Sequence, residues 1–232
     1  MIQSWPENFK ALVFGANGAL GRAFVQQLQV DPRCAQVVAV SRQSVPGLDL
    51  LDESSIAACA QTLASQGPFH LILDATGALA LNGRGPEKRL DELDTEQLLR
   101  VMHLNAVGPA LLLKYFVPSL ATGQRVIWAK LSARVGSIDD NRKGGWYGYR
   151  ASKAALNMLL QTAAIEIARR RPLIVVAALQ PGTVRSPLSQ SFVGEDVMSP
   201  EASVSRLLAV LAELEPNGRA HFVDHLGKNI PW

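Results

Sequence analysis

Cysteine and histidine are scarce in this sequence, and their scarcity excludes two kinds of site. Only two of the 232 residues are cysteines, Cys34 and Cys59, and they do not form a CxxC pair, so neither a disulfide framework nor a zinc site is indicated. The four histidines are scattered without the spacing of metal ligands such as HExxH. We therefore predict reduced thiols and no metal.

Long apolar runs and a strong net charge are also missing. No apolar run is long enough to span a bilayer, and the start, Met1 to Pro6, lacks the basic and then apolar order of a secretory signal. The net charge is only +3, and the densest basic run, 169–171, has no aromatic residues interleaved with its arginines. We expect a cytoplasmic protein with no membrane or nucleic-acid partner, whose mild basic balance suits anionic cofactor phosphates.

What the sequence does contain is a regular alternation of apolar β-type runs with helical patterns. Strands that are apolar throughout are covered on both faces, as in parallel sheets. We expect strands at 11–14, 37–40, 71–73, 125–128, 173–178 and 220–223, and helices at 20–29, 54–65, 95–116, 149–169 and 201–214. This order predicts an α/β fold: a Rossmann-type doubly wound parallel sheet of about seven strands flanked by helices on both faces, in one domain over residues 1–232, with sites at the carboxyl ends of the strands.

A glycine-rich turn with the pattern GxxGxxG directly follows the first expected strand. Glycine permits a tight turn and a close backbone approach, so that free N–H groups at the start of the next helix can hold a pyrophosphate. The position of the turn at the first strand–helix junction predicts dinucleotide binding. The predicted contacts are Gly15, Asn17, Gly18, Ala19, Leu20 and Gly21.

The second expected strand ends at Ser41 and Arg42. An acidic residue there would accept hydrogen bonds from the adenosine 2′-hydroxyl, whereas a serine and an arginine accommodate a 2′-phosphate. Arg22, just after the glycine turn, adds positive charge. We therefore favour NADP(H) as the cofactor, with NAD(H) as the alternative.

Tyr149 and Lys153 are four residues apart at the start of a long helical pattern, so one helix face presents a phenol beside an ammonium. A tyrosine hydroxyl, with a pKa of about 10, is a poor proton donor at neutral pH. A nearby cation favours the phenolate and lowers the pKa of the phenol toward the working range. By itself this pair is more often a matter of packing and solvation, but the glycine turn in the same chain favours catalysis.

With these motifs the chain resembles the short-chain dehydrogenase/reductase family over nearly its whole length. Residues 74–77 are similar to the family's Asn-Asn-Ala-Gly motif, and 181–184 to the loop that holds the nicotinamide amide. More narrowly, the stretches 131–138, 144–149 and 227–232 resemble the C-factor (C-signal) branch, which is poorly defined by substrate. The resemblance implies further cofactor contacts at Asp49, Leu50, Ala75, Thr76, Gly77, Asn105, Pro181, Gly182, Thr183 and Val184.

Three departures from the family pattern bear on function. The glycines are spaced as in extended or atypical members, and Phe14 replaces the usual threonine before them, which should leave phosphate binding intact. Ala133 stands where the family's catalytic serine usually stands, one position after Ser132. Because one residue along a strand reverses the direction of the side chain, Ser132 reaches the substrate only if the strand has ended or bulged there. Ser137 is a further candidate, and a serine that bonds backbone at a strand end is the alternative interpretation.

The resemblance implies reversible hydride transfer between NADP(H) and a small carbonyl or alcohol substrate, as in carbonyl reductases. In that mechanism Tyr149 is the general acid/base, and Lys153 lowers its pKa and binds the nicotinamide ribose. Asn105 holds a water in the proton path, and Ser132 polarises the carbonyl.

Two further expectations follow, together with one rival interpretation. Residues 185–199 would form a substrate lid, and family members usually pair through the two long helices, which implies a homodimer or homotetramer. The rival, motivated by Ala133, is a nucleotide-binding regulatory or cell-signalling protein of the same fold with weak or no catalysis.

Overall fold

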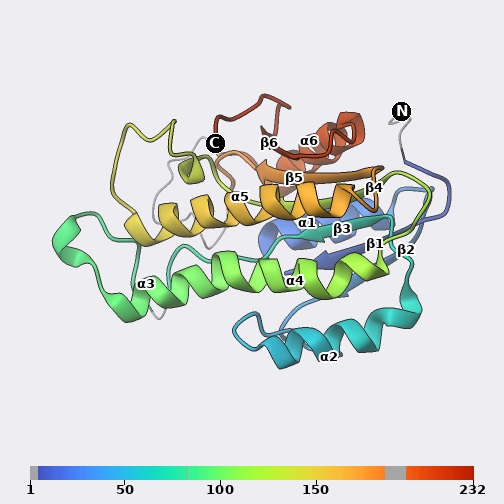
Figure 1. The fold of residues 1–232 in the computed structure, drawn as a ribbon, viewed down its shortest axis with the longest axis horizontal. Coiled ribbons are helices and arrows are strands. Elements are labelled where there is room, and N and C mark those ends of the chain that lie inside the picture. The colour runs from blue at the N-terminus through green and yellow to red at the C-terminus, as the bar shows by residue number, and fades with distance from the viewer. Residues whose placement is uncertain (1–4, 82, 186–196) are drawn as a thin grey trace.

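A parallel β-sheet with helices on both faces forms the centre of the molecule (Figure 1). The structure, a computed structural model, describes residues 5–81, 83–185 and 197–232, and within these ranges the sheet has six strands in the order β2-β1-β3-β4-β5-β6. The predicted Rossmann-type doubly wound fold is confirmed, with six strands where about seven were expected. The strands are β1 (Phe9–Phe14), β2 (Cys34–Val40), β3 (Leu71–Asp74), β4 (Val126–Leu131), β5 (Ile174–Gln180) and β6 (Ala220–Asp224).

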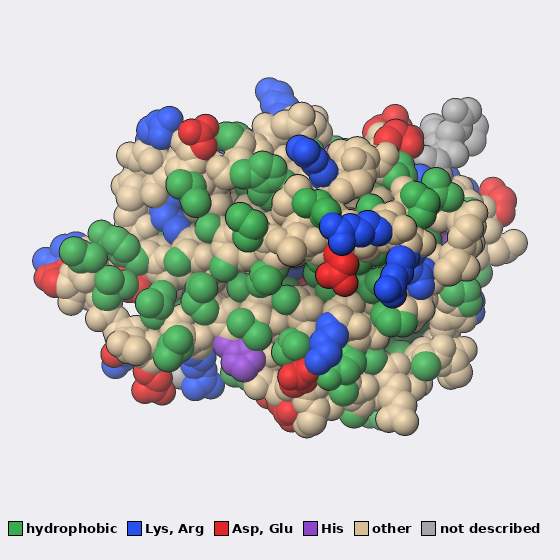
Figure 2. All heavy atoms as spheres, in the orientation of Figure 1, with side chains coloured by type: hydrophobic (Ala, Val, Ile, Leu, Met, Phe, Trp, Pro, Cys, Tyr) green, Lys and Arg blue, Asp and Glu red, His purple; other side chains and the backbone are tan. Residues whose placement is uncertain are grey.

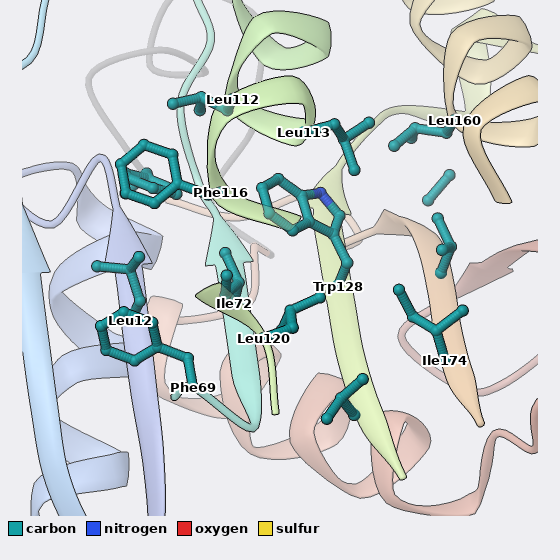
Figure 3. Packing of buried hydrophobic residues seen from close by; sticks show 14 of the residues in the cluster. Leu12, Phe69, Ile72, Leu112, Leu113, Phe116, Leu120, Trp128, Leu160 and Ile174 are labelled. Carbon is teal, nitrogen blue, oxygen red and sulfur yellow. The ribbon is translucent and has the colours of Figure 1, made fainter. Parts of the chain in front are cut away.

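Helices cover the two faces of the sheet and give it two hydrophobic cores. Apolar residues of α2, α4 and α5 pack on one face, and those of α1 and α6 pack on the other. In Figure 3, Trp128 points from β4 toward Leu113 of α4. No helix in the described ranges is both long and apolar enough to cross a bilayer. The helices are α1 (Ala19–Gln29), α2 (Glu53–Leu63), α3 (Thr95–Met102), α4 (Gly108–Phe116), α5 (Tyr147–Ala168) and α6 (Pro200–Glu213).

The central strands β3 and β4 are buried along their whole length, as their apolar sequences predict. Two of the residues in this buried layer are charged, namely Asp74 at the end of β3 and Lys130 in β4. They are direct partners in the parallel pairing of the two strands. Burying charge is costly unless it is paired, so these two residues call for an explanation beyond packing.

The helix expected over 95–116 is interrupted in its middle. A π-helical segment, His103–Val107, separates α3 from α4. Such segments occur frequently at functional sites, because the wider turn redirects a side chain. Here it carries Asn105, which is fully buried.

Candidate active site

A cleft of about 1560 Å³ lies at the carboxyl ends of the strands. Its walls come from the segments that follow β1, β3, β4 and β5 and from the first turns of α5, which is where a doubly wound sheet is expected to bind its ligand. The cleft brings together predicted residues from both halves of the chain. Those that line it are Asn17, Gly18, Ala19, Leu20, Arg42, Ala75, Thr76, Gly77, Ser132, Tyr149, Lys153, Pro181, Gly182, Thr183 and Val184.

The glycine turn after β1 is a close backbone crossing that tolerates no side chain. A Cβ on Gly21 would lie 2.1 Å from the carbonyl oxygen of Gly15, and a Cβ on Gly15, whose φ is +74°, would lie 2.9 Å from the carbonyl carbon of Ala75. Gly18 is the N-cap of α1 and provides no side chain to cap it. The first N–H groups of a helix have no partner within it, so this end of α1 offers donors and a positive dipole to an anion in the cleft.

The end of β2 lies beside this turn. The amide of Asn17 donates to the hydroxyl oxygen of Ser41 at 3.0 Å and to the side-chain oxygen of Gln43 at 2.9 Å. Arg42 is exposed and lines the cleft, as does Arg22, whose guanidinium donates to the carbonyl of Asn17 at 2.9 Å. Two cations therefore border the part of the cleft that adjoins β2, where the sequence predicts the cofactor's 2′-phosphate.

Asp49 and Leu50 do not line the cleft in this structure. The Asp49 carboxylate accepts a hydrogen bond from the N–H of Leu51 at 2.9 Å. Leu50 is buried against α4, where a Cβ on Gly108 would lie 2.9 Å from the Leu50 Cβ. Their predicted contact with adenine stays a prediction. Four other predicted residues also do not line the cleft. Each of them contacts a residue that lines the cleft or the turn to which such a residue belongs; they are Gly15, Gly21, Ser41 and Asn105.

Asn105 fixes the backbone on the far side of the turn that follows β3. Its side-chain amide donates to the carbonyl of Ala78 and accepts from the N–H of Ala78, both at 2.9 Å. It also donates to the hydroxyl of Ser152 on α5 at 3.2 Å. A Cβ on Gly77 would lie 3.3 Å from the Asn105 side-chain oxygen and 3.5 Å from the Lys153 Nζ, so these groups converge around one glycine.

Tyr149 and Lys153 lie in the first turns of α5. Lys153 is only 3% exposed, its Nζ donates to the carbonyl of Leu131 at 3.1 Å, and it lies 5.7 Å from the centroid of the Tyr149 ring. Burial, together with the nearby Lys130 ammonium and against the attraction of Asp74, lowers the pKa of Lys153 to about 7. Burial raises the pKa of Tyr149 to about 12. The pKa of Tyr149 thus moves in the direction opposite to the lowering expected from the lysine, and burial is the cause of the shift.

The start of α5 is held by a residue that the sequence analysis missed, Glu87. This carboxylate is 6% exposed and accepts a hydrogen bond from the N–H of Gly148 at 2.9 Å. The Glu87 carbonyl accepts from the N–H of Trp146, which has a left-handed φ of 55°. The Trp146 ring lies 6.2 Å from the Tyr149 ring, edge to face. Nothing in the loop around Glu87 marked it in the sequence, because its role depends on a contact with a helix 61 residues away.

Ser132 follows the end of β4 and lines the cleft together with Ala133. Its hydroxyl donates to the side-chain oxygen of Asn157 on α5 at 2.7 Å, and the serine is 4% exposed. Ser137, the further candidate, is 2% exposed, and its hydroxyl oxygen accepts from the N–H of Asp140 at 3.0 Å. The strand has ended before Ser132, as the prediction required, yet its hydroxyl proton is directed to another side chain.

The loop after β5 closes the other end of the cleft. The carbonyl of Pro181 accepts a hydrogen bond from the hydroxyl of Ser203 at 2.6 Å, and Gly182 adopts a φ of +81°. The carbonyl of Thr183 accepts from the N–H of Met198 at 3.1 Å. Most of the predicted substrate lid, residues 186–196, lies outside the described residues.

Known proteins match this chain over most of its length. Residues 12–222 match the family model described as enoyl-(acyl carrier protein) reductase. The C-signal protein of Myxococcus xanthus is 33% identical over 167 residues, which cover 72% of this chain and 94% of that protein. The 1-hydroxy-2-glutathionyl-2-methyl-3-butene dehydrogenase of Rhodococcus sp. (strain AD45) is 28% identical over 95% of this chain and 98% of its own.

Solved structures share the fold. The NADPH-bound carbonyl reductase from chicken fatty liver superposes with a TM-score of 0.85, at 23% identity, over 99% of this chain and 96% of its own. A short-chain dehydrogenase from Burkholderia cenocepacia J2315 in complex with NADP gives a TM-score of 0.74 at 19% identity, over 93% of this chain and 88% of its own.

Proposed function

Because this chain belongs to the short-chain dehydrogenase/reductase family, we propose that it is an NADP(H)-dependent oxidoreductase. In this proposal it transfers a hydride between the nicotinamide and a small carbonyl or alcohol substrate, with Tyr149 as the general acid/base. The observation that carries the proposal is that one cleft contains both the open amino end of α1 and the pair formed by Tyr149 and Lys153. A phosphate-binding end and a proton donor are the two parts that such a reaction needs.

The residues present fit a dinucleotide. The close approach of Gly15 and Gly21 leaves room for a pyrophosphate at α1, and Arg22 and Arg42, which line the cleft, would bind a 2′-phosphate in this proposal. Two proteins of the same fold are named with NADP or NADPH bound, which supports the preference for NADP(H). When bound, the nicotinamide supplies or accepts the hydride, and the rest of the chemistry falls to the protein.

The protonation state of Tyr149 suits reduction of a carbonyl. Because burial raises the pKa of Tyr149 to about 12, the phenol carries its proton at neutral pH, and its transfer to a forming alkoxide requires stabilisation of the phenolate. In this proposal Lys153 stabilises the phenolate that forms when Tyr149 gives up its proton, and it hydrogen-bonds the nicotinamide ribose. Asn105 holds the backbone at Ala78 and, in this proposal, a water in the proton path.

We propose that Ser132 polarises the carbonyl. The surroundings of Ser132 also support the rival interpretation. Its hydroxyl donates to Asn157, and its neighbour in the cleft is Ala133. The alternative function, a nucleotide-binding regulatory or cell-signalling protein with weak or no catalysis, is favoured by these two observations and by the similarity to a protein named C-signal.

We also propose that the protein is a homodimer or homotetramer. Figure 2 shows hydrophobic side chains gathered over the face that α4 and α5 present in Figure 1. A second copy of this face would bury them, as family members usually do. The exposed apolar residues on α3, the π-helical segment and α5 are Leu99, Val107, Met158, Leu159 and Ile165.

Replacement of Tyr149 by Phe tests the proposed function. The variant loses the proton donor and keeps the ring, so turnover of a carbonyl substrate with NADPH should fall by about 10²–10⁴-fold while NADPH affinity is retained. Tyr147→Phe is the matched control, because Tyr147 does not line the cleft. Full activity in Tyr149→Phe contradicts the assignment.

A panel of aldehydes and ketones separates the enzyme from its rival. The wild-type protein is assayed with NADPH and NADH, and nucleotide affinity is measured by titration. Tight NADPH binding without turnover of any substrate in the panel would favour the regulatory protein, whereas turnover that disappears in Tyr149→Phe supports the oxidoreductase.

A further inference from the structure

An ion pair between Asp74 and Lys130 lies completely buried behind the wall of the cleft. Neither side chain has any exposed surface, and the Lys130 Nζ lies 2.9 Å from the Asp74 Oδ1. The two residues face each other across β3 and β4, on the side of the sheet that carries Asn105 and α5. A buried charge pair is weak evidence for stability, because apolar residues of similar size are often as good. Its position therefore suggests another role.

The ion pair is hydrogen-bonded to Thr76, in the turn at 75–77 that lines the cleft. Besides Asp74, the Lys130 ammonium donates to the carbonyl of Thr76 at 2.7 Å and to its hydroxyl oxygen at 2.9 Å, which uses all three ammonium protons. The Asp74 Oδ1 accepts hydrogen bonds from both the N–H and the hydroxyl of Thr76. The conformation of Thr76, and with it that of the cleft wall, is thus fixed by the pair.

The same turn is where the two halves of the cleft meet. On one side it packs against the glycine turn, because a Cβ on Gly15 would lie 3.0 Å from the N–H nitrogen of Thr76. On the other side Gly77 lies close to Asn105 and to the Lys153 ammonium. A displacement of Thr76 would therefore disturb the phosphate-binding turn and the catalytic lysine together.

Lys130 also acts on Lys153 through its charge. The titratable groups around Lys153 are Tyr149 on its own helix, Lys130 on β4 and Asp74 at the end of β3. Burial is the main cause of the low pKa of Lys153, repulsion by Lys130 is the next, and attraction by Asp74 opposes both. The second lysine thus biases the first toward its neutral form.

We propose that Lys130, through Asp74 and Thr76, is a positioning residue that holds the cleft wall at 75–77 in place for the nucleotide. This inference rests on the proposed function, since it assigns a second lysine to the same site. Lys130 itself does not line the cleft, so it acts through Thr76 and Lys153 and touches no ligand.

The decisive variant is the double replacement D74N/K130M. It removes both charges, so no unpaired charge stays buried, and the amide oxygen introduced at position 74 can still accept from the N–H of Thr76. We expect NADPH to bind about tenfold more weakly, because Thr76 loses the two hydrogen bonds that Lys130 donates to it. We also expect the limb of the pH profile of kcat/KM that reports Lys153 to move to higher pH, because the lost repulsion exceeds the lost attraction. A residue that only stabilised the fold would lower the melting temperature and move neither quantity.

Lys10→Met is the matched control. Lys10 in β1 also donates to backbone carbonyls, those of Gln66 and Gly67, but from the opposite end of the sheet. It should leave the NADPH dissociation constant and the pH profile unchanged. A folded D74N/K130M with wild-type affinity and an unchanged pH profile overturns the proposal for Lys130 alone. A wild-type protein that binds neither NADPH nor NADH overturns the proposed function as well.

Discussion

The two sides of the cleft differ in the groups that form them. The proposed phosphate-binding side, after β1, is made of backbone: three glycines cross closely and leave the end of α1 open. The proposed catalytic side, at the start of α5, is made of buried polar side chains, including Lys153, Asn105 and Glu87, each hydrogen-bonded to a segment far away in the sequence. Changes on the first side should affect nucleotide binding, and changes on the second should affect turnover.

This difference shows how each side tolerates substitution. A close backbone crossing fails sterically as soon as a Cβ is added, whatever the chemistry of the side chain. A network of buried polar groups depends on partners, so a substitution that keeps the hydrogen bond is tolerated and one that leaves a partner unsatisfied is not. The four substitutions below test this contrast, in order of decreasing expected effect.

Lys153→Met should have the largest effect on turnover, and it changes the side of the cleft that is formed by buried polar side chains. It removes the ammonium beside Tyr149, so turnover should fall by about 10³-fold, within the range typical of a lost acid–base partner. The change in NADPH affinity should be much smaller than the change in turnover. Steady-state kinetics and a nucleotide titration on the same protein measure both, and an equal loss in the two would contradict the division between the sides.

The same variant should also change how stability depends on pH. Lys153 has a pKa of about 7 in the folded protein against an ordinary 10.5, so between these values the unfolded chain binds a proton that the folded protein has lost. The free energy of unfolding therefore gains a contribution that rises with pH through this window and is constant below it. Urea unfolding of the wild type and of Lys153→Met at several pH values should show a steeper rise with pH in the wild type, because burial also lowers the pKa of Lys130, which both proteins keep. Parallel curves would show that the folded pKa of Lys153 is not lowered.

Gly21→Ala should have the next largest effect, on the backbone side. Its Cβ would lie 2.1 Å from the Gly15 carbonyl oxygen, so the turn must move. We expect about a hundredfold loss of NADPH affinity, equivalent to about 2.7 kcal/mol. Gly123→Ala is a suitable control, because that glycine has nothing within 4 Å of its Cβ. Since Gly123 has a positive φ of 73°, the control should cost some stability but no affinity.

Ser132→Ala should reduce turnover by about tenfold. This is less than the 10²–10³ typical of a dedicated oxyanion donor, because the Ser132 hydroxyl donates to Asn157 in this structure. Ser137→Ala, which removes the other candidate hydroxyl, should leave turnover unchanged. If Ser132→Ala lowers only the melting temperature, Ser132 is a structural serine and the regulatory alternative gains support.

Glu87→Ala should have the smallest effect, a loss of about 1 kcal/mol in the free energy of unfolding, as for other lost helix caps. Because Tyr149 lies in the turn that Glu87 caps, turnover should fall by less than tenfold. Glu87→Gln keeps the acceptor for the Gly148 N–H, so it should retain most of the stability and most of the turnover of the wild type. Equal losses in Ala and Gln would mean that the charge of Glu87, and not its hydrogen bond, is what matters.

The sequence predicted the backbone side of the cleft better than the other. Gly15, Gly18 and Gly21 were identified because only glycine satisfies a close crossing, and that requirement is local. Tyr149 and Lys153 could be paired because helical spacing is local too. The parallel sheet and the helices on both of its faces also followed from the alternation of apolar runs with helical patterns.

The features of the site that the sequence did not predict depend on contacts between distant segments. Lys130 lies beyond the strand expected at 125–128, and its pairing with Asp74 is visible only once β3 and β4 lie side by side. The direction of the Ser132 hydroxyl depends on Asn157, 25 residues further along the chain. The burial of Tyr149 depends on the walls of the whole cleft, so its pKa could not be predicted from its neighbour on the helix alone.

Trp146 illustrates a conflict between stability and the proposed activity. A bulky residue in the left-handed region costs roughly 1 kcal/mol that glycine would not incur, and two glycines precede it in the chain. Replacement of Trp146 by glycine would relieve this strain. The same change would remove the indole that lies 6.2 Å from the Tyr149 ring, and with it a contact beside the proposed proton donor.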